Sequence, residues 1–206
     1  MSVSGGYIDE YCMAFGLVGG MGVDLANKIL EVIPSEREFF QMPQRDLEAI
    51  AGRRHKMLSA EYRASVLDDA RRELDLISQK GIKYYYFRDS YYPSRLLHAP
   101  DAPILLFGIG ECDLNATKIV SVVGTRHATH YGIDMTNRLV DGLAAYFPDI
   151  IIVSGLAYGI DVAAHNAAIR NNLTTVGVLA HGLNQIYPAA HRSVASKMAR
   201  GGGMLV

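Results

Sequence analysis

The sequence predicts an α/β protein in which a small all-α module precedes a doubly wound, mainly parallel sheet. Up to about residue 62, apolar residues recur at helical spacing in short pieces, whereas from residue 82 onward β-branched and aromatic runs alternate with helical stretches. One such run, Ile150–Val153, is apolar at every position, as expected for a central strand that is covered on both faces. Repetition of strand and helix in this order favours a parallel sheet.

The N-terminal module consists of short predicted helices separated by glycine and proline. These helices cover residues 7–18, 23–32, 36–41 and 58–79, and a further turn opens at Pro43. Gly81 follows the last of them and is the residue type that ends a helix in the left-handed conformation. We therefore expect a helical module over residues 1–62 and a sheet domain over residues 63–206.

The sheet domain is predicted from its alternation of elements. The expected strands cover residues 82–87, 103–108, 118–123, 149–154, 173–180 and 203–206, and the expected helices cover residues 131–147, 159–170 and 189–200. The chain stops within the last predicted strand. We therefore expect the sheet to be truncated at its C-terminal end and the natural protein to be longer.

The composition argues against a disordered, a membrane-spanning or a disulfide-rich secreted protein. Half of the 206 residues are hydrophobic, which favours a folded domain over a disordered chain, and no apolar run is long enough for a membrane span. The N-terminus shows no secretion signal. The two cysteines, Cys12 and Cys112, form neither a disulfide framework nor a metal-ligand pattern, so we expect a cytoplasmic protein with no metal and no cofactor.

Charge is unevenly distributed along the chain. The formal net charge is −1, yet no acidic residue follows Asp161, whereas four cations do. These cations are Arg170, Arg192, Lys197 and Arg200. The sequence therefore permits either a focused anion site near the C-terminal end or simply a solvated basic surface.

Three glycine-containing loops follow predicted strands and mark the expected ligand site. They are residues 124–126, 154–161 and 180–188. Ligands of parallel α/β sheets bind where such loops leave the carboxyl ends of the strands, and the amide groups at a helix N-terminus favour anions. We expect a phosphate-binding cleft into which Arg126 points, with Arg192 as a second cation.

Several motifs leave alternatives open. No G-x-G-x-x-G follows Gly124 and no P-loop string occurs, which argues against dinucleotide binding and against ATP hydrolysis by a P-loop. Asp161 and His165 are four residues apart, so they form either an acid–base pair or two separate structural contacts. His127 and His130 lack a third ligand for a metal. Tyr158 lies in the second loop and could stack on a base, or simply pack there.

Four strings of this sequence occur in a recognisable order. They are Y-P-S-R-L at 92–96, S-V-V-G-T-R at 121–126, I-V-S-G-L-A-Y-G-I-D at 152–161 followed by A-H at 164–165, and G-L-N-Q-I-Y-P at 182–188. Together they resemble the DNA-processing protein A family, DprA or Smf. The resemblance covers the chain from about residue 7 to the end. It implies a Rossmann-like domain preceded by a module of the SAM or helix-hairpin-helix type, the latter on residues 18–22 and Ala26.

The function that this resemblance implies is not enzymatic. Family members bind incoming single-stranded DNA during natural transformation, protect it, form homodimers and load the RecA recombinase. Carried over by motif, the residues expected to bind DNA or phosphate are Gly124, Thr125, Arg126, Ser154, Gly155, Ala157, Tyr158, Gly159, Asp161, His165, Gly182 and Arg192.

The sequence departs from the family pattern at two places. Tyr158 stands where many members have arginine, and Ala180–Gly182 keeps only the last glycine of a G-x-G. A rival hypothesis is a Rossmann-like nucleotide-binding enzyme of the phosphoribohydrolase type, although the P-G-G-x-G-T-x-x-E string of that class does not occur in these residues.

Overall fold

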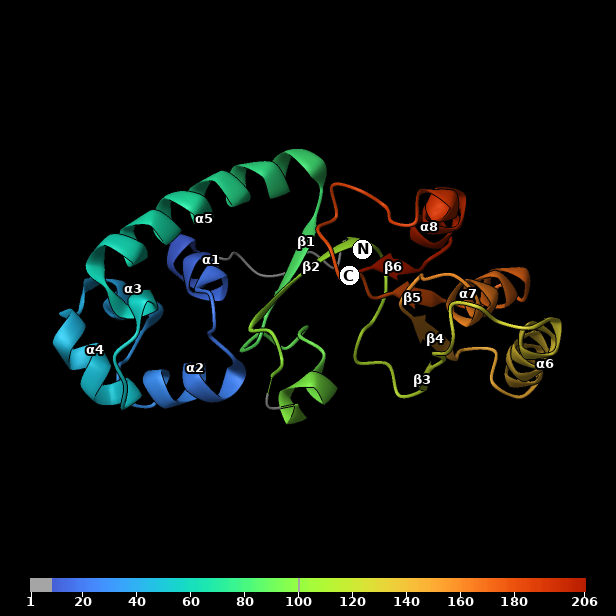
Figure 1. Cartoon of the computed structure of the whole chain (residues 1–206), viewed down its shortest axis with the longest axis horizontal. Coiled ribbons are helices and arrows are strands. Elements are labelled where there is room, and N and C mark those ends of the chain that lie inside the picture. Colours follow the sequence, from blue (N-terminus) through green and yellow to red (C-terminus); the bar gives the residue numbers. More distant parts are fainter. Residues whose placement is uncertain (1–8, 100) are drawn as a thin grey trace. The chain divides into compact units, whose positions relative to one another are not determined.

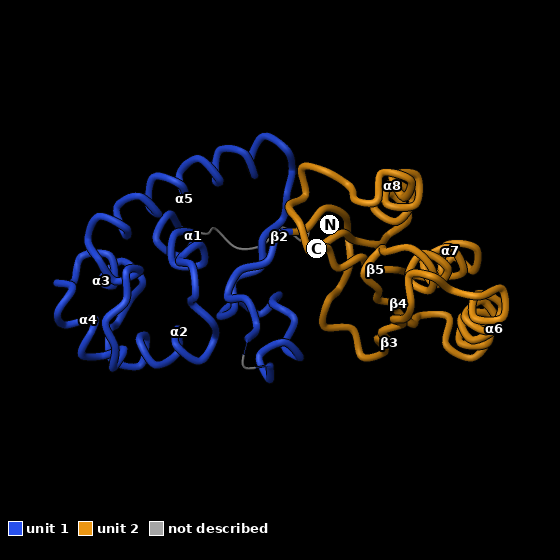
Figure 2. Tube along the Cα trace, viewed as in Figure 1, with its two compact units in different colours: residues 1–107 blue, residues 108–206 orange. Residues whose placement is uncertain are grey.

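A computed structural model gives the structure of the protein and describes residues 9–99 and 101–206. Figure 1 shows the elements in chain order, and Figure 2 divides the chain into two compact units, residues 1–107 and 108–206. The boundary between the units falls within strand β2 (Leu105–Gly110). Each unit is described by itself below.

Unit 1 is built mainly from helices. Its elements are α1 (Glu10–Leu17), α2 (Val23–Leu30), α3 (Glu36–Gln41), α4 (Gln44–Ala51), a 3₁₀ turn (Lys56–Leu58), α5 (Ala60–Lys80), strand β1 (Lys83–Tyr86) and a second 3₁₀ turn (Ser94–His98). The predicted start of the first helix, at Tyr7, lies outside the described residues. Gly81 ends α5 in the left-handed conformation, as predicted.

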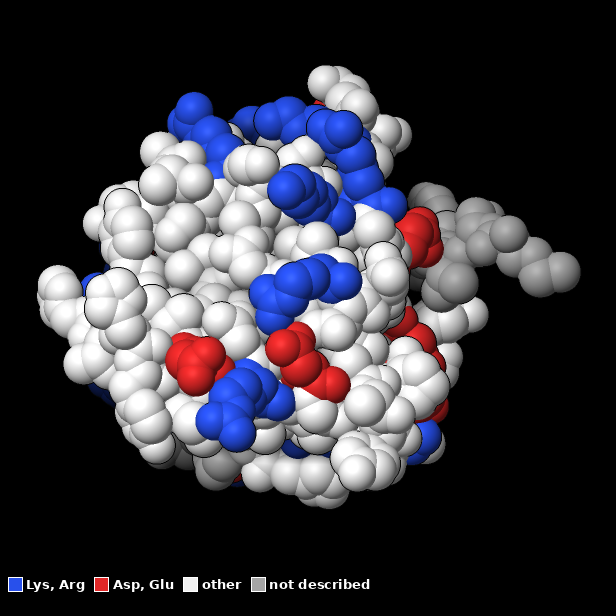
Figure 3. Space-filling view, turned by 90° about the vertical axis from the view of Figure 1, so that its right-hand side faces the viewer, with Lys and Arg blue, Asp and Glu red and all other residues white. Residues whose placement is uncertain are grey.

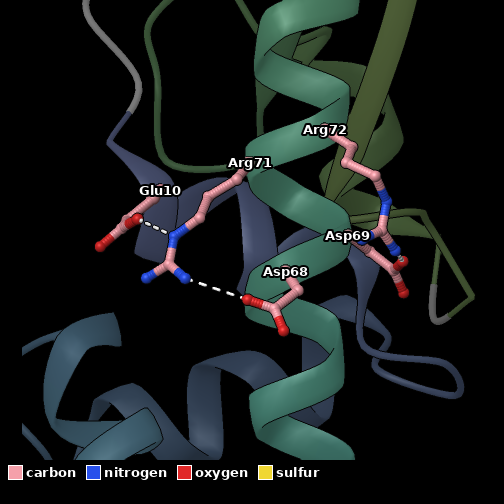
Figure 4. A network of polar contacts seen from close by, with 5 residues as sticks. All are labelled: Glu10, Asp68, Asp69, Arg71 and Arg72. Carbon is pink, nitrogen blue, oxygen red and sulfur yellow. Dashed lines mark hydrogen bonds and ion pairs between the residues drawn. The ribbon is translucent and has the colours of Figure 1, made fainter.

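Helix α5 is held to the preceding helices by charged side chains. The guanidinium of buried Arg63 donates to the carbonyls of Phe39 and, at 2.8 Å, Met42, which close the C-terminal end of α3. On the surface, Arg71 joins Glu10 of α1 at 2.8 Å (Figure 4). Arg71 also contacts Asp68 of its own helix, and Arg72 contacts Asp69.

The predicted boundary at residue 62/63 therefore falls inside a continuous helix. The first turn of α5 carries Arg63, whose contacts are with α3, so α5 belongs structurally with the helices that precede it. Residues 63–107 lie in unit 1 and not with the rest of the predicted sheet domain.

The sheet has six strands in the order β1-β2-β6-β5-β4-β3. Unit 2 contributes β3 (Ile119–Ser121), β4 (Ile151–Ser154), β5 (Thr175–Gly177) and β6 (Met204–Leu205). These four strands are parallel to one another, and β6 also pairs with β2, which is antiparallel to it. The mainly parallel α/β class is thus confirmed.

Three helices connect the parallel strands. They are α6 (His130–Tyr146), α7 (Ile160–Arg170) and α8 (Arg192–Arg200), the last preceded by a 3₁₀ turn (Ala189–His191). The strands follow one another in one direction across the sheet, so right-handed crossovers place all three helices on the same face of these strands, as Figure 1 shows. Within the described residues of unit 2, the winding is therefore one-sided.

The core of unit 2 lies between this helical layer and the strands. Fully buried Val140 of α6, Ile152 of β4 and Ala164 of α7 belong to one apolar cluster. A second cluster joins Leu156 to Ala195 and Met198 of α8 and to Leu205 of β6. Small alanines on α7 let it pack closely against β4 and against α6.

Helix α6 also presents apolar side chains to solvent. Tyr131, Met135, Leu139 and Tyr146 lie along its outer side at helical spacing, and each is exposed. Val123, just beyond the edge strand β3, is exposed as well. Over the described parts of the chain, no helix combines the length and the apolar character that a membrane crossing requires.

Candidate functional site

The three predicted loops meet at the carboxyl ends of β3, β4 and β5. They line one hollow of about 120 Å³. The first loop contributes Arg126, and the second contributes Gly155, Ala157 and Tyr158. The third contributes Ala180, His181, Tyr187 and Pro188. The convergence follows from parallel strands, whose carboxyl ends share one edge of the sheet.

A second, wider hollow adjoins the first. It measures about 460 Å³ and is lined by residues 126–128, by Tyr158 and Gly159 of the second loop, and by Ile133 of α6. Arg126 and Tyr158 line both hollows, so a cation and an aromatic ring stand where they join. Arg126 is exposed, and none of the ion pairs among the described residues involves it.

Two glycines allow the first two loops to approach each other. Gly159 has a φ of 77°, and a Cβ at this position would lie 2.2 Å from the carbonyl oxygen of Thr125. A Cβ on Gly124 would lie 2.7 Å from Ile160. The hydroxyl of Thr125 accepts from the His127 amide at 3.2 Å, which shapes the turn that carries Arg126.

Asp161 braces the second loop from within. It is buried, and its carboxylate accepts hydrogen bonds from the amides of Gly155 at 3.2 Å and of Ala157 at 3.4 Å. These two amides are therefore engaged by the protein itself. An anion in the hollow depends more on side-chain cations, and less on backbone amides, than the sequence suggested.

Ser154 and His165 lie beneath the site. The Ser154 hydroxyl donates to the Val122 carbonyl at 2.6 Å and so connects the end of β4 to the residue that follows β3. His165 is fully buried, with Nδ1 2.7 Å from the Thr175 hydroxyl. The same hydroxyl lies 2.8 Å from the Ile152 carbonyl, and among the described residues no hydrogen-bond partner is within reach of His165 Nε2.

Burial lowers the pKa of His165 to about 4, although nearby Asp161 and the Ser154 carbonyl act in the opposite direction. The imidazole is thus neutral at physiological pH. Asp161 contacts loop amides and His165 contacts Thr175, which corresponds to the hypothesis of two separate structural contacts. The structure shows no hydrogen bond between these two described side chains.

Tyr158 is positioned by a neighbouring ring. Its side chain is 48% exposed, and its ring meets that of His191 edge-on at 5.0 Å. His191 is buried, and its Nδ1 lies 2.8 Å from the Leu156 carbonyl. His191 therefore contacts the tyrosine ring from one side, while the Tyr158 side chain remains accessible from the hollow.

Gly182 and Arg192 do not line either hollow. Gly182 is exposed, and its carbonyl lies 3.0 Å from His181 Nδ1. Arg192 is exposed at the first position of α8. His127 and His130 are exposed as well, and the described residues contain no cluster of three or more potential metal ligands.

Sequence reasoning did not include four residues that line or support the site among the expected binding residues. His181 and Tyr187 line the first hollow, His127 lines the second, and His191 supports Tyr158. The loop at 180–188 was predicted to lie here, so its side chains could have been included. The role of His191 depends on a contact between two distant segments, for which the sequence gives no signal.

Comparison with known proteins places this chain in a family. The profile of the family described as DNA recombination-mediator protein A matches residues 83–206. The DNA processing protein DprA of Streptococcus pneumoniae is 37% identical over 149 residues, which are 71% of this chain and 50% of that protein. Protein Smf of Synechocystis is 29% identical over 199 residues, which are 95% of this chain and 50% of that protein.

The folds agree as well. The crystal structure of DprA from Streptococcus pneumoniae superposes with a TM-score of 0.65 and 26% identity, covering 97% of this chain and 67% of that one. The chain spans about half the length of the curated relatives named above. The chain belongs to the DNA recombination-mediator protein A family, the DprA/Smf family.

Proposed function

We propose that the chain binds single-stranded DNA in the two adjoining hollows at the carboxyl ends of β3, β4 and β5. The observation that carries the proposal is the position of Arg126 and Tyr158, which both line the two hollows. A guanidinium holds phosphate oxygens, and an aromatic ring stacks on any base, so the pair suits a strand of any sequence. The family description, which names DNA recombination, supports this assignment.

Single strands fit this site better than duplexes. The first hollow measures only about 120 Å³, and its lining brings two tyrosines within reach of an unpaired base. In a duplex the bases are paired and stacked internally, so the tyrosine rings could not engage them. We expect binding to depend little on sequence and to weaken with salt, because phosphate contacts release counterions.

The test is the affinity of the full chain for oligo-dT at several salt concentrations. Arg126→Ala should weaken binding to all sequences and reduce the slope of log K against log salt by about 0.7, the loss of one phosphate contact to a single strand. Arg138→Ala is the matched control, since Arg138 is an exposed arginine on α6 outside both hollows. If the two variants change the affinity for oligo-dT and its salt dependence equally, Arg126 is not part of the DNA site.

The role of Tyr158 is tested separately. If bases stack on it, Tyr158→Ala should cost about 1–3 kcal/mol of binding free energy, and Tyr158→Phe should cost little. If phosphates pass there instead, Tyr158→Arg should raise the affinity. A loss of affinity with Tyr158→Arg supports stacking.

We also propose the finer roles that the family resemblance implies, namely protection of incoming DNA, loading of RecA, and homodimer formation by the longer protein. Protection is tested by nuclease digestion of oligo-dT with and without the chain. Loading is tested by the rate at which RecA assembles on single strands. If the chain protects oligo-dT from the nuclease but leaves the rate of RecA assembly unchanged, its role is restricted to DNA binding.

The rival hypothesis of a phosphoribohydrolase has its own test. Release of free base from nucleoside monophosphates that are incubated with the chain would favour that hypothesis.

A further inference from the structure

Helix α8 has one apolar side and one basic side. Ala195 and Met198 are buried in the cluster with Leu156 and Leu205. The opposite side carries the residues that we call the α8 basic face. It consists of Arg192, Ser193, Ser196, Lys197 and Arg200, of which only Ser196 is partly covered. Positions 192, 196 and 200 are four residues apart, so they lie in one row along the helix.

The cations of the α8 basic face have no acidic counterpart. No Asp or Glu occurs after Asp161, and among the described residues no ion pair involves Arg192, Lys197 or Arg200. Two other basic residues of unit 2 differ in this respect, because Lys118 pairs with Asp149 and Arg170 pairs with Asp141. Figure 3 shows the side of the molecule that lies at the right of Figure 1, and in the upper part of that view Lys and Arg outnumber Asp and Glu.

The far end of this face is hollowed. Ser196, Lys197, Arg200 and Gly201 line a depression of about 270 Å³. Lys197 also borders a neighbouring hollow of about 170 Å³ that contains Asn172. The C-terminus of a helix carries roughly half a negative charge. Two full positive charges exceed that amount, so the depression attracts anions even after the helix dipole is neutralised.

The path of α8 connects this depression to the proposed DNA site. Arg192 follows the loop at 180–188, whose residues line the first hollow at the carboxyl end of β5. The other end of α8 lies beside Leu173 and Thr175, at the amino end of β5. Arg192 and Arg200 are separated by about 12 Å along the helix axis, at 1.5 Å per residue.

We propose that the α8 basic face is a track for the sugar-phosphate backbone of a single strand that leaves the hollows at the carboxyl ends of the sheet. This inference rests on the proposed function and adds a second contact region to it. The ligand is a polyanion because the face offers three cations and two hydroxyls, which suits consecutive phosphates. The face offers no aromatic side chain, so it contributes affinity without contacting bases.

The test compares short and long oligo-dT, of about 4 and about 16 nucleotides, the range of site sizes in single-strand binding folds. The variant is the double substitution Lys197→Gln with Arg200→Gln. Affinity for the short strand should be unchanged, because it fills only the hollows. Affinity for the long strand should fall, and its salt slope should decrease by about 1.4, the loss of two phosphate contacts.

The matched control is Lys118→Gln with Arg170→Gln, which removes the same charge from paired cations of the same unit. If both double variants weaken binding of the long strand equally, net charge alone explains the effect and the track is overturned. Equal loss on short and long strands also overturns it.

Arg126→Ala separates this inference from the proposed function. If Arg126→Ala weakens binding while the α8 variant binds both lengths like the wild type, the hollows bind DNA and the track is wrong. If the unaltered chain binds neither length, both proposals fail. If the α8 variant instead loses binding to an acidic peptide while its binding to both DNA lengths is unchanged, the face belongs to a protein partner and the track is wrong.

Discussion

At the scale of single residues, Asp161 determines the shape of the loop that forms one wall of the site. Its buried carboxylate accepts from two amides of residues 155–157, at the first turn of α7. Asp161→Ala leaves those amides without their partner. It should lower the free energy of unfolding by about 1.5–3 kcal/mol, the contribution of hydrogen bonds to a charged group.

Urea denaturation of the full chain measures this change. Asp141→Ala is the control, because Asp141 is exposed and its contacts with Arg170 and Asn171 lie at the surface, where solvent screens them. If both variants lose the same small amount, the bracing role of Asp161 is wrong.

His165 makes the stability of unit 2 depend on pH. Its pKa is about 4 in the folded chain, against 6.5 for the free side chain, because burial disfavours the charged imidazole. The unfolded chain therefore binds more protons between these values. The contribution of neutral His165 to the free energy of unfolding is fully present above about pH 6.5 and is lost as the pH falls towards 4. At 1.36 kcal/mol per pKa unit, the loss amounts to up to about 3 kcal/mol.

The measurement is the free energy of unfolding in urea between pH 7 and pH 4.5. His165→Gln, which cannot titrate, should show a shallower decrease than the wild type over this interval. Parallel curves for the two proteins would contradict a depressed pKa at His165.

The sequence could not decide between the alternatives for Asp161 and His165. Their spacing of four shows that they share a helix face, but the partners that separate them lie elsewhere. Thr175 holds His165 from the next strand, and the amides that bind Asp161 belong to the loop before the helix. Which contact forms is decided by tertiary packing.

At the scale of elements, helices were predicted more accurately than strands. The helix over residues 36–41 was predicted with its observed bounds, and Gly81 marks the end of α5 as expected. The predicted strand over residues 173–180 is reduced to Thr175–Gly177, because its flanking residues belong to the turn and the loop at either end. The 3₁₀ turns at 56–58, 94–98 and 189–191 are too short to show a periodicity.

Substitution of alanine for two glycines, Gly159 and Gly142, should have opposite effects on the stability of the chain. Gly159→Ala places a Cβ against the Thr125 carbonyl at a positive φ, so it should destabilise the chain by about 1–3 kcal/mol. Gly142 lies inside α6 with open space around it, so Gly142→Ala should stabilise the chain by about 0.5–1 kcal/mol.

Thermal unfolding of both variants measures the difference, with Gly159→Ala melting at a lower temperature and Gly142→Ala at a higher one than the wild type. A neutral Gly159→Ala would show that the two loops do not approach each other as closely as described.

At the scale of the whole molecule, the sequence predicted the class of the sheet and the edge at which the loops meet. It did not predict where the chain divides into units, because the contacts of Arg63 that join α5 to the earlier helices form between segments about 20 residues apart. It also did not predict that the Asp161 carboxylate accepts hydrogen bonds from the amides of Gly155 and Ala157, so that these amides are already engaged within the protein.

The exposed apolar side chains of α6 should make the chain associate as its concentration rises. Leu139→Glu should shift this association to a concentration at least about tenfold higher, since covering a leucine contributes about 1.5–3 kcal/mol. Sedimentation velocity over a concentration series measures the shift. Val32→Glu, at an exposed apolar residue of unit 1, should have no effect. A wild-type chain that stays monomeric throughout would contradict the prediction.

Because Asp161 engages two loop amides, anions in the first hollow would be held mainly by the side chain of Arg126. A cradle of backbone N–H groups would recognise the geometry of a phosphate, whereas an exposed guanidinium attracts negative charge of any origin. Inorganic polyphosphate or a sulfated sugar polymer would therefore compete for Arg126. If the hollows bind single-stranded DNA as proposed, selectivity for nucleic acid must come from the phenol rings of Tyr158 and Tyr187, on which unpaired bases can stack.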